Sequence, residues 1–147
     1  QRDGEYQIDS NTIRDNGEDG INLKAPGQEV RSMFIQGNDV YRNGRHGLNL
    51  EDGTAINMDV VNNRFWNNGL TASGNGINLA SEVKISSFSA NKIRDIQSTP
   101  TQQYPVYASG TLTDVDISFN HCVGNAQNTL NLTGTQTRVT TLNNPGI

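Results

Sequence analysis

The chain is poor in several residue types, and each shortage excludes a class of protein. Its 147 residues include one cysteine, Cys122, so no internal disulfide can form. No stretch approaches the roughly 18 apolar residues of a membrane-spanning helix, so we expect no membrane partner. No histidines and cysteines have metal-ligand spacing, and we expect no metal and no other cofactor. A net charge of −4 argues against a nucleic-acid partner.

Apolar residues are also scarce, and residues that favour turns take their place. Hydrophobic residues make up 33% of the chain, beside 15 glycines and 20 asparagines. This content is too apolar for a disordered chain and too rich in turn formers for a helical bundle. The length allows one domain with its own core. We therefore expect a single turn-rich domain over residues 1–147.

One short phrase recurs at nearly constant spacing. It reads NGEDGINL from Asn16, NGRHGLNL from Asn43 and SGNGINL up to Leu79. An asparagine followed two places later by an apolar residue recurs with spacings of 27, 25, 28 and 29 residues, at Asn11, Asn38, Asn63, Asn91 and Asn120. Two further pairs, mostly apolar, in each repeat are also two positions apart, which is strand periodicity. A repeat of three short strands without a helix predicts one coil of a parallel β-helix.

Stacked coils would bury the inward pairs in one narrow core and place equivalent residues about 4.8 Å apart. The recurring asparagine falls at a turn, where its amide can both donate to and accept from its equivalents in neighbouring coils. We therefore predict an all-β fold of about five coils with an internal asparagine ladder. The ladder accounts for the asparagine content without any function.

The phrases SNTIRDNGEDGINL, GNDVYRNGRHGLNL and NNRFWNNG…GNGINL resemble the repeats of right-handed parallel β-helices of the pectate-lyase-like superfamily. The resemblance covers nearly the whole chain. It is poorest in the fourth coil, where RDIQSTPTQQYPVYAS replaces the phrase and predicts a longer loop. The superfamily includes lyases, hydrolases, epimerases, tailspikes and inert shafts, so the fold alone does not identify the function. Because QRDGEYQID starts part-way through a coil, we expect the C-terminal part of a longer β-helix, covered by preceding coils or a capping partner.

The residues that change between repeats are candidates for a substrate groove on the GINL strand, which is where the resemblance implies one. Outward-facing positions on or beside that strand form rows, and the candidate substrate-binding residues among them are Asn22, Asn49, Asn78, Tyr107, Lys24, Glu51 and Arg45. A further row holds the candidate catalytic residues Asp19, His46 and Tyr104. Neighbours in a row should lie about 5 Å apart.

The catalytic hypothesis is proton abstraction from a sugar acid. His46 would transfer the proton, Asp19 would hold its tautomer and raise its basicity, and Tyr104 would supply a second proton-transfer group. Arg45 and Lys24 would neutralise the sugar carboxylate. The plainer interpretations are a surface contact between Asp19 and His46 at a turn, and a cross-strand ion pair between Lys24 and Glu51. Asp19 with Glu51 could also span the separation of a glycoside hydrolase pair.

Two aromatic residues fall in another outward row, after the recurring asparagine. Tyr41 and Trp66 are neighbours there, between Arg14 and Arg94. They could form an aromatic platform that binds a sugar ring. Alternatively, they stabilise a cross-strand stack without any ligand.

Within the superfamily, the phrasing most resembles mannuronan C5-epimerases and related alginate enzymes, in which DNG.DG is followed one coil later by RHG. The resemblance implies that Arg45 and His46 contact substrate. The catalytic Asp-Pro-His signature is absent from the chain, and position 24 holds lysine where that family has an acid.

The first functional hypothesis is thus elimination or C5-epimerisation of a uronic-acid polysaccharide. The alternatives are a glycoside hydrolase and a non-catalytic, often trimeric rod or receptor-binding segment of the tailspike or adhesin type. Either role predicts an extracellular or virion-associated protein.

Overall fold

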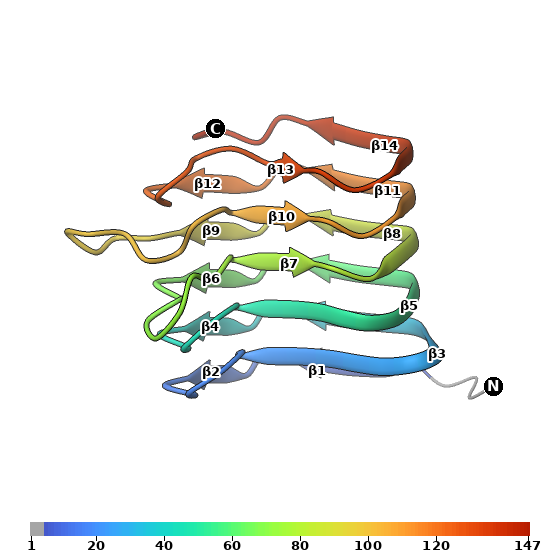
Figure 1. Ribbon diagram of the computed structural model, residues 1–147, viewed down its shortest axis with the longest axis horizontal. Coiled ribbons are helices and arrows are strands. Elements are labelled where there is room, and N and C mark those ends of the chain that lie inside the picture. The colour runs from blue at the N-terminus through green and yellow to red at the C-terminus, as the bar shows by residue number, and fades with distance from the viewer. Residues whose placement is uncertain (1–4) are drawn as a thin grey trace.

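The computed structural model describes residues 5–147 as a solenoid of parallel strands, with no helix among those residues (Figure 1). Each coil adds strands to two parallel sheets. The larger sheet contains β1 (Tyr6–Asp9), β3 (Ile21–Gln36), β5 (Leu48–Val61), β7 (Ile77–Leu79), β8 (Glu82–Ser89), β10 (Val106–Ala108), β11 (Leu112–Ser118), β13 (Asn131–Leu132) and β14 (Gln136–Leu142). The smaller contains β2 (Thr12–Arg14), β4 (Asp39–Tyr41), β6 (Arg64–Trp66), β9 (Lys92–Arg94) and β12 (His121–Val123).

The predicted parallel β-helix is therefore confirmed, and so is its register, except that β3 and β5 shift after Leu23 and Lys24 pairs with Asp52 instead of Glu51. Ile21 pairs with Leu48, Leu48 with Ile77, and Ile77 with Val106, as the recurring phrase requires. We call the side formed by β7, β10, β13 and the first parts of β3 and β5 the front face. It lies nearest the viewer in Figure 1.

The coils differ from the prediction in one respect. Three separate short strands were expected in each coil, but β3 and β5 are continuous over 16 and 14 residues. Each of these strands rounds the corner that follows the front face. Gly27 with a φ of 65° and Gly53 with a φ of 90° lie at this corner. Glycine adopts such angles without steric cost, so the strand can turn there without ending.

The inward pairs form the core, as the two-residue periodicity predicts. Leu48, Ile77, Val60, Phe88 and Ile117 are fully buried. Most inward residues of the outermost described coils, such as Ile8, Leu23 and Leu132, are only partly buried, because a neighbouring coil covers them on one side alone. Burial of one such aliphatic side chain stabilises the fold by about 1.5–3 kcal/mol.

The predicted asparagine ladder is present inside the turn that precedes the smaller sheet. The side-chain Nδ2 of Asn63 donates to Oδ1 of Asn91 at 3.1 Å, and the main-chain N–H of Asn63 donates to the same oxygen at 3.0 Å. Nδ2 of Asn63 also donates to the carbonyl of Ile35, at 2.8 Å. The same pattern runs through Asn11, Asn38, Asn63, Asn91 and Asn120, and Asn144 extends it by one coil.

A second ladder, which the sequence analysis did not predict, follows the smaller sheet. Nδ2 of Asn43 donates to Oδ1 of Asn68 at 3.0 Å, and Nδ2 of Asn68 donates to Oε1 of Gln102 at 3.0 Å. Gln102 then donates to Asn125 at 2.6 Å. The asparagine that begins each NG phrase could have predicted this ladder. In the irregular fourth coil a glutamine takes the place of that asparagine, so the repeat is not recognisable there.

Candidate functional site

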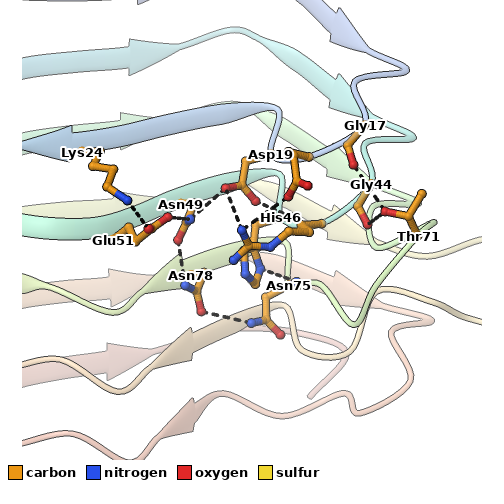
Figure 2. A network of polar contacts seen from close by, with 12 residues as sticks. Gly17, Asp19, Lys24, Gly44, His46, Asn49, Glu51, Thr71, Asn75 and Asn78 are labelled. Carbon is orange, nitrogen blue, oxygen red and sulfur yellow. Dashed lines mark hydrogen bonds and ion pairs between the residues drawn. The ribbon is translucent and has the colours of Figure 1, made fainter.

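The row predicted to be catalytic, which begins with Asp19 and His46, lies where the loop of each coil meets the front face. It forms a third ladder of hydrogen bonds (Figure 2). The main-chain N–H of His46 donates to Oδ1 of Asp19 at 3.0 Å, and the N–H of Asn75 donates to Nδ1 of His46 at 2.9 Å. The N–H of Tyr104 donates to Oδ1 of Asn75 at 3.3 Å. The side chains of Asp19, His46 and Asn75 thus have the same role: each accepts one main-chain hydrogen bond from the next coil.

This geometry corrects the role expected of Asp19. The carboxylate was expected to hold the imidazole of His46, but it accepts from the main chain of that residue instead. Asp19 does raise the pKa of His46, as expected, but the net pKa is lowered. Burial lowers the pKa of His46, and Arg45 lowers it further, while the opposing effect of Asp19 is smaller than that of burial.

His46 is therefore neutral at neutral pH, and its protonation state follows from its contacts. Because Nδ1 accepts an N–H, the proton of the ring resides on Nε2. Among the described residues, every fully buried side-chain nitrogen or oxygen has a hydrogen-bond partner. Nε2 of His46 has no partner in the protein, so it must be accessible to solvent. The ring presents an N–H donor to solvent and keeps its lone pair inside the ladder.

The three predicted catalytic residues do not converge. Asn75 occupies the coil between His46 and Tyr104, and Tyr104 joins the row through its main chain. No group of three or more histidine, cysteine, aspartate or glutamate side chains that could hold a metal ion occurs in the described part of the chain.

Two asparagines expected to be solvent-facing substrate contacts are covered. Asn49 and Asn78 point outward from the front face but are 1% and 7% exposed. Asn75 donates to Asn78 at 3.2 Å, and Asn78 donates to Asn49 at 2.8 Å. The neighbouring amides of the row cover one another along the axis of the solenoid. The alternation of residues within one coil does not predict this burial. Asn22, at the end of the same row, is exposed.

The two bases of the front face are paired within the protein. Lys24 Nζ lies 2.6 Å from Glu51 and 3.6 Å from Asp52, so the predicted ion pair is confirmed. The hydrogen bond from Lys24 lowers the pKa of Glu51. Arg45 lies 3.5 Å from Glu18 and 3.9 Å from Asp19.

The two carboxylates of the expected glycoside hydrolase pair share one amide donor. Nδ2 of Asn49 lies between the two carboxylates, 2.8 Å from Asp19 and 3.2 Å from Glu51. A hydrolase needs one of them protonated, with a raised pKa. The pKa of Glu51 is lowered, mainly by Lys24, so Glu51 cannot be that acid near neutral pH.

The predicted aromatic stack is present on the smaller sheet. The rings of Tyr41 and Trp66 lie 4.4 Å apart at an angle of 17°. Arg14 lies over Tyr41 at 5.9 Å and Arg64 over Trp66 at 5.6 Å, while the indole N–H donates to Asp39 at 2.7 Å. Because the ring faces meet other side chains, the pair offers mainly edges to solvent. This arrangement supports the cross-strand stack over the sugar platform.

A second aromatic pair lies on the front face, and the sequence analysis had placed its members in separate rows. Tyr104 and Tyr107 stack with ring centroids 5.8 Å apart and an angle of 27°. Both are partly exposed. Tyr107 lies on β10, and Tyr104 lies at the end of the β9–β10 loop, which projects further than the other loops in Figure 1.

Asp95, a residue that the sequence analysis missed, fixes this loop. Its carboxylate is 3% exposed and accepts the main-chain N–H groups of Gln97 at 3.0 Å, Thr101 at 2.7 Å and Gln102 at 2.8 Å. An aspartate that gathers nearby N–H groups is a local turn signal, but RDIQ gives no hint that the partners lie up to seven residues away. The loop thereby holds Gln102 in the second ladder and the tyrosines on the front face.

A hollow of about 670 Å³ opens beside the first coil, away from the tyrosine pair. Asn22 and Lys24 line it together with Leu23, Val30 and Met33. The apolar lining consists of inward residues at the margin of the core. The hollow therefore follows from the incomplete cover of the first coil and not from a separate polar site.

Residues 1–121 match a family model described as the right handed beta helix region. No curated protein and no solved structure matches the chain. In the described part of the chain, no helix is long and apolar enough to cross a membrane.

Proposed function

Since the chain belongs to the right-handed β-helix family, we propose that it is a non-catalytic β-helix that binds polysaccharide through the tyrosine pair on its front face. One observation carries the proposal. The long loop between β9 and β10 ends by placing Tyr104 beside Tyr107 of β10, and the two rings stack 5.8 Å apart on the front face. Binding residues are often presented in this way, by a loop on a rigid scaffold.

The chemistry beside the tyrosines suits a sugar. A tyrosine ring face packs against the apolar C–H groups of a sugar ring, and its hydroxyl adds a polar contact. Asn75 and Asn78 lie next to the pair, and each uses only one of its two amide hydrogens within the ladder. Both side chains are nearly covered, at 8% and 7% exposed, so the polar contacts to a glycan come from the exposed Gln103, Ser109 and Asn128 around the pair. Tyrosine also loses little rotamer entropy when it binds.

The contacts of the predicted catalytic residues favour binding over chemistry. A base that abstracts a proton needs a lone pair directed at the substrate, and the lone pair of His46 is occupied by the N–H of Asn75. Glu51 is held ionised by Lys24. The lyase or epimerase activity, and the catalytic roles of His46, Asp19 and Tyr104, stay predictions.

The test of function is binding of soluble oligosaccharides by calorimetry, with Tyr107→Ala as the binding variant. Tyr41→Ala, on the smaller sheet, is the matched control. We expect Tyr107→Ala to weaken binding about tenfold, from the loss of one aromatic contact, and Tyr41→Ala to leave it unchanged. Equal losses in both variants contradict the site. Absence of binding to any sugar, with a trimer by light scattering, supports the rod with a protein partner instead.

Catalysis is tested separately, with His46→Asn. This variant keeps a side-chain acceptor for the N–H of Asn75, as Asn75 itself provides for Tyr104, but it cannot transfer a proton. We expect no unsaturated or epimerised product from uronate polymers with the wild-type chain. Turnover that His46→Asn abolishes while the melting temperature is kept refutes the non-catalytic assignment.

A further inference from the structure

We infer that the glycan bound at the tyrosine pair is uncharged, a conclusion that rests on the proposed function and narrows its ligand class. Three observations support it: the absence of charge around the pair, the chemistry of the exposed groups there, and the state of the charges on the first two coils.

The part of the front face that surrounds the tyrosines contains no ionisable acid or base. Residues 65–81, 96–113 and 122–137 include no aspartate, glutamate, lysine, arginine or histidine. These stretches build β7, β10 and β13 together with the loops that lead into them. Three successive coils thus present a front face without a single formal charge, although 18% of the chain is charged.

The exposed groups on this surface are amides, hydroxyls and aromatic rings. Gln103, Ser109 and Asn128 are exposed around the partly exposed Tyr104 and Tyr107. Such groups bind the hydroxyls and C–H faces of a neutral sugar. A carboxylate, by contrast, gains little here, because binding would remove its water and supply no cation in return.

The adjoining coils of the front face disfavour a polyanion. On the front-face parts of β3 and β5 and in the loops before them, the lysine and arginine side chains are those of Lys24, Arg42 and Arg45, and all three are already paired with carboxylates. Their partners are five acids, namely Asp15, Glu18, Asp19, Glu51 and Asp52. His46 adds no charge, since burial lowers its pKa. A uronate chain that extends along the coils would meet this net negative surface within about one Debye length of 8–10 Å.

The test compares charged and neutral ligands of equal length. The probes are hexasaccharides of glucose, mannose and xylose, and hexasaccharides of galacturonate and mannuronate, measured by calorimetry at low and at high salt. We expect at least one neutral probe to bind at least tenfold more tightly than either uronate, with the same affinity at both salt concentrations. Tyr107→Ala should weaken that binding about tenfold.

A charge variant separates specificity from binding. Gln103→Lys adds an exposed cation next to Tyr104, so uronate binding should rise several-fold and become weaker in high salt, while the neutral probe is unaffected. Tighter binding of a uronate than of every neutral probe by the wild-type chain overturns the inference and leaves the glycan-binding function intact. Failure of all five probes overturns both.

Discussion

The contact between His46 and Asn75 gives a direct test of the third ladder. His46→Ala removes the acceptor that lies 2.9 Å from the N–H of Asn75, a residue that is 8% exposed. A buried donor left without a partner costs about 1–3 kcal/mol. For a chain of this length, each kcal/mol corresponds to a change in melting temperature of about 2–4 °C. His46→Asn restores an acceptor and should recover most of the loss at neutral pH.

The same contact makes stability depend on pH. The pKa of His46 is lowered in the folded state, first by burial, so the folded chain binds this proton less readily than the unfolded chain does. The contribution of the neutral ring is therefore complete above the ordinary histidine pKa of about 6.5. It is lost as the pH falls below that value, through the lowered pKa of the folded state. His46→Asn should lack this component.

The assay is thermal unfolding followed by circular dichroism, for wild type and both variants, on either side of the ordinary histidine pKa. His121 is present in all three proteins, so the difference between wild type and His46→Asn isolates His46. Two results refute the reasoning. One is equal stability of His46→Ala and His46→Asn at neutral pH, and the other is an identical pH dependence of wild type and His46→Asn.

Three other substitutions test the core, the backbone and the packing of coils, each by its melting temperature. Ile77→Asp places a carboxylate in a fully buried position and should cost more than about 4 kcal/mol, against about 0.5–1.5 kcal/mol for Ile77→Val; equal effects would contradict the register. Ile85 has a φ of 49° and is 61% exposed, so Ile85→Asn should stabilise by about 1 kcal/mol, and a loss would show that the isoleucine makes a needed contact. Gly44→Ala drives a Cβ into the carbonyl of Gly17 in the previous coil, whereas Gly17→Ala meets nothing within 4 Å, so only the first should destabilise.

The fold was predictable because every coil requires the same residue types at the same positions. Two inward positions per strand and one asparagine per turn recur at fixed spacing, so Ile77 and Asn63 could be placed in the core and in the ladder from the sequence alone. The ion pair of Lys24 with Glu51 was predicted from the repeat, and it forms although a shift in register after Leu23 pairs Lys24 with Asp52. Neighbour relations between adjacent coils are thus readable wherever the repeat is regular.

The details of the site were less predictable, because they depend on side-chain direction and on an irregular loop. The register placed Asp19 beside His46 correctly, but it could not tell that the carboxylate meets the main chain and not the ring. The burial of Asn49 arises from neighbours on other coils. Asp95 and its partners lie in the one stretch without a repeat, where periodicity gives no information.

The glutamine in the second ladder also bears on how such a protein can change. Gln102 takes the place of an asparagine after an insertion of several residues, and the hydrogen bonds to Asn68 and Asn125 are kept. The ladder requires a carboxamide at one point in space, not at one distance along the chain. Loops of different length and composition are therefore exchangeable at this corner if they return a carboxamide there. The corner is accordingly a natural position for grafting new recognition loops, in evolution or by engineering, while the coils beneath stay the same.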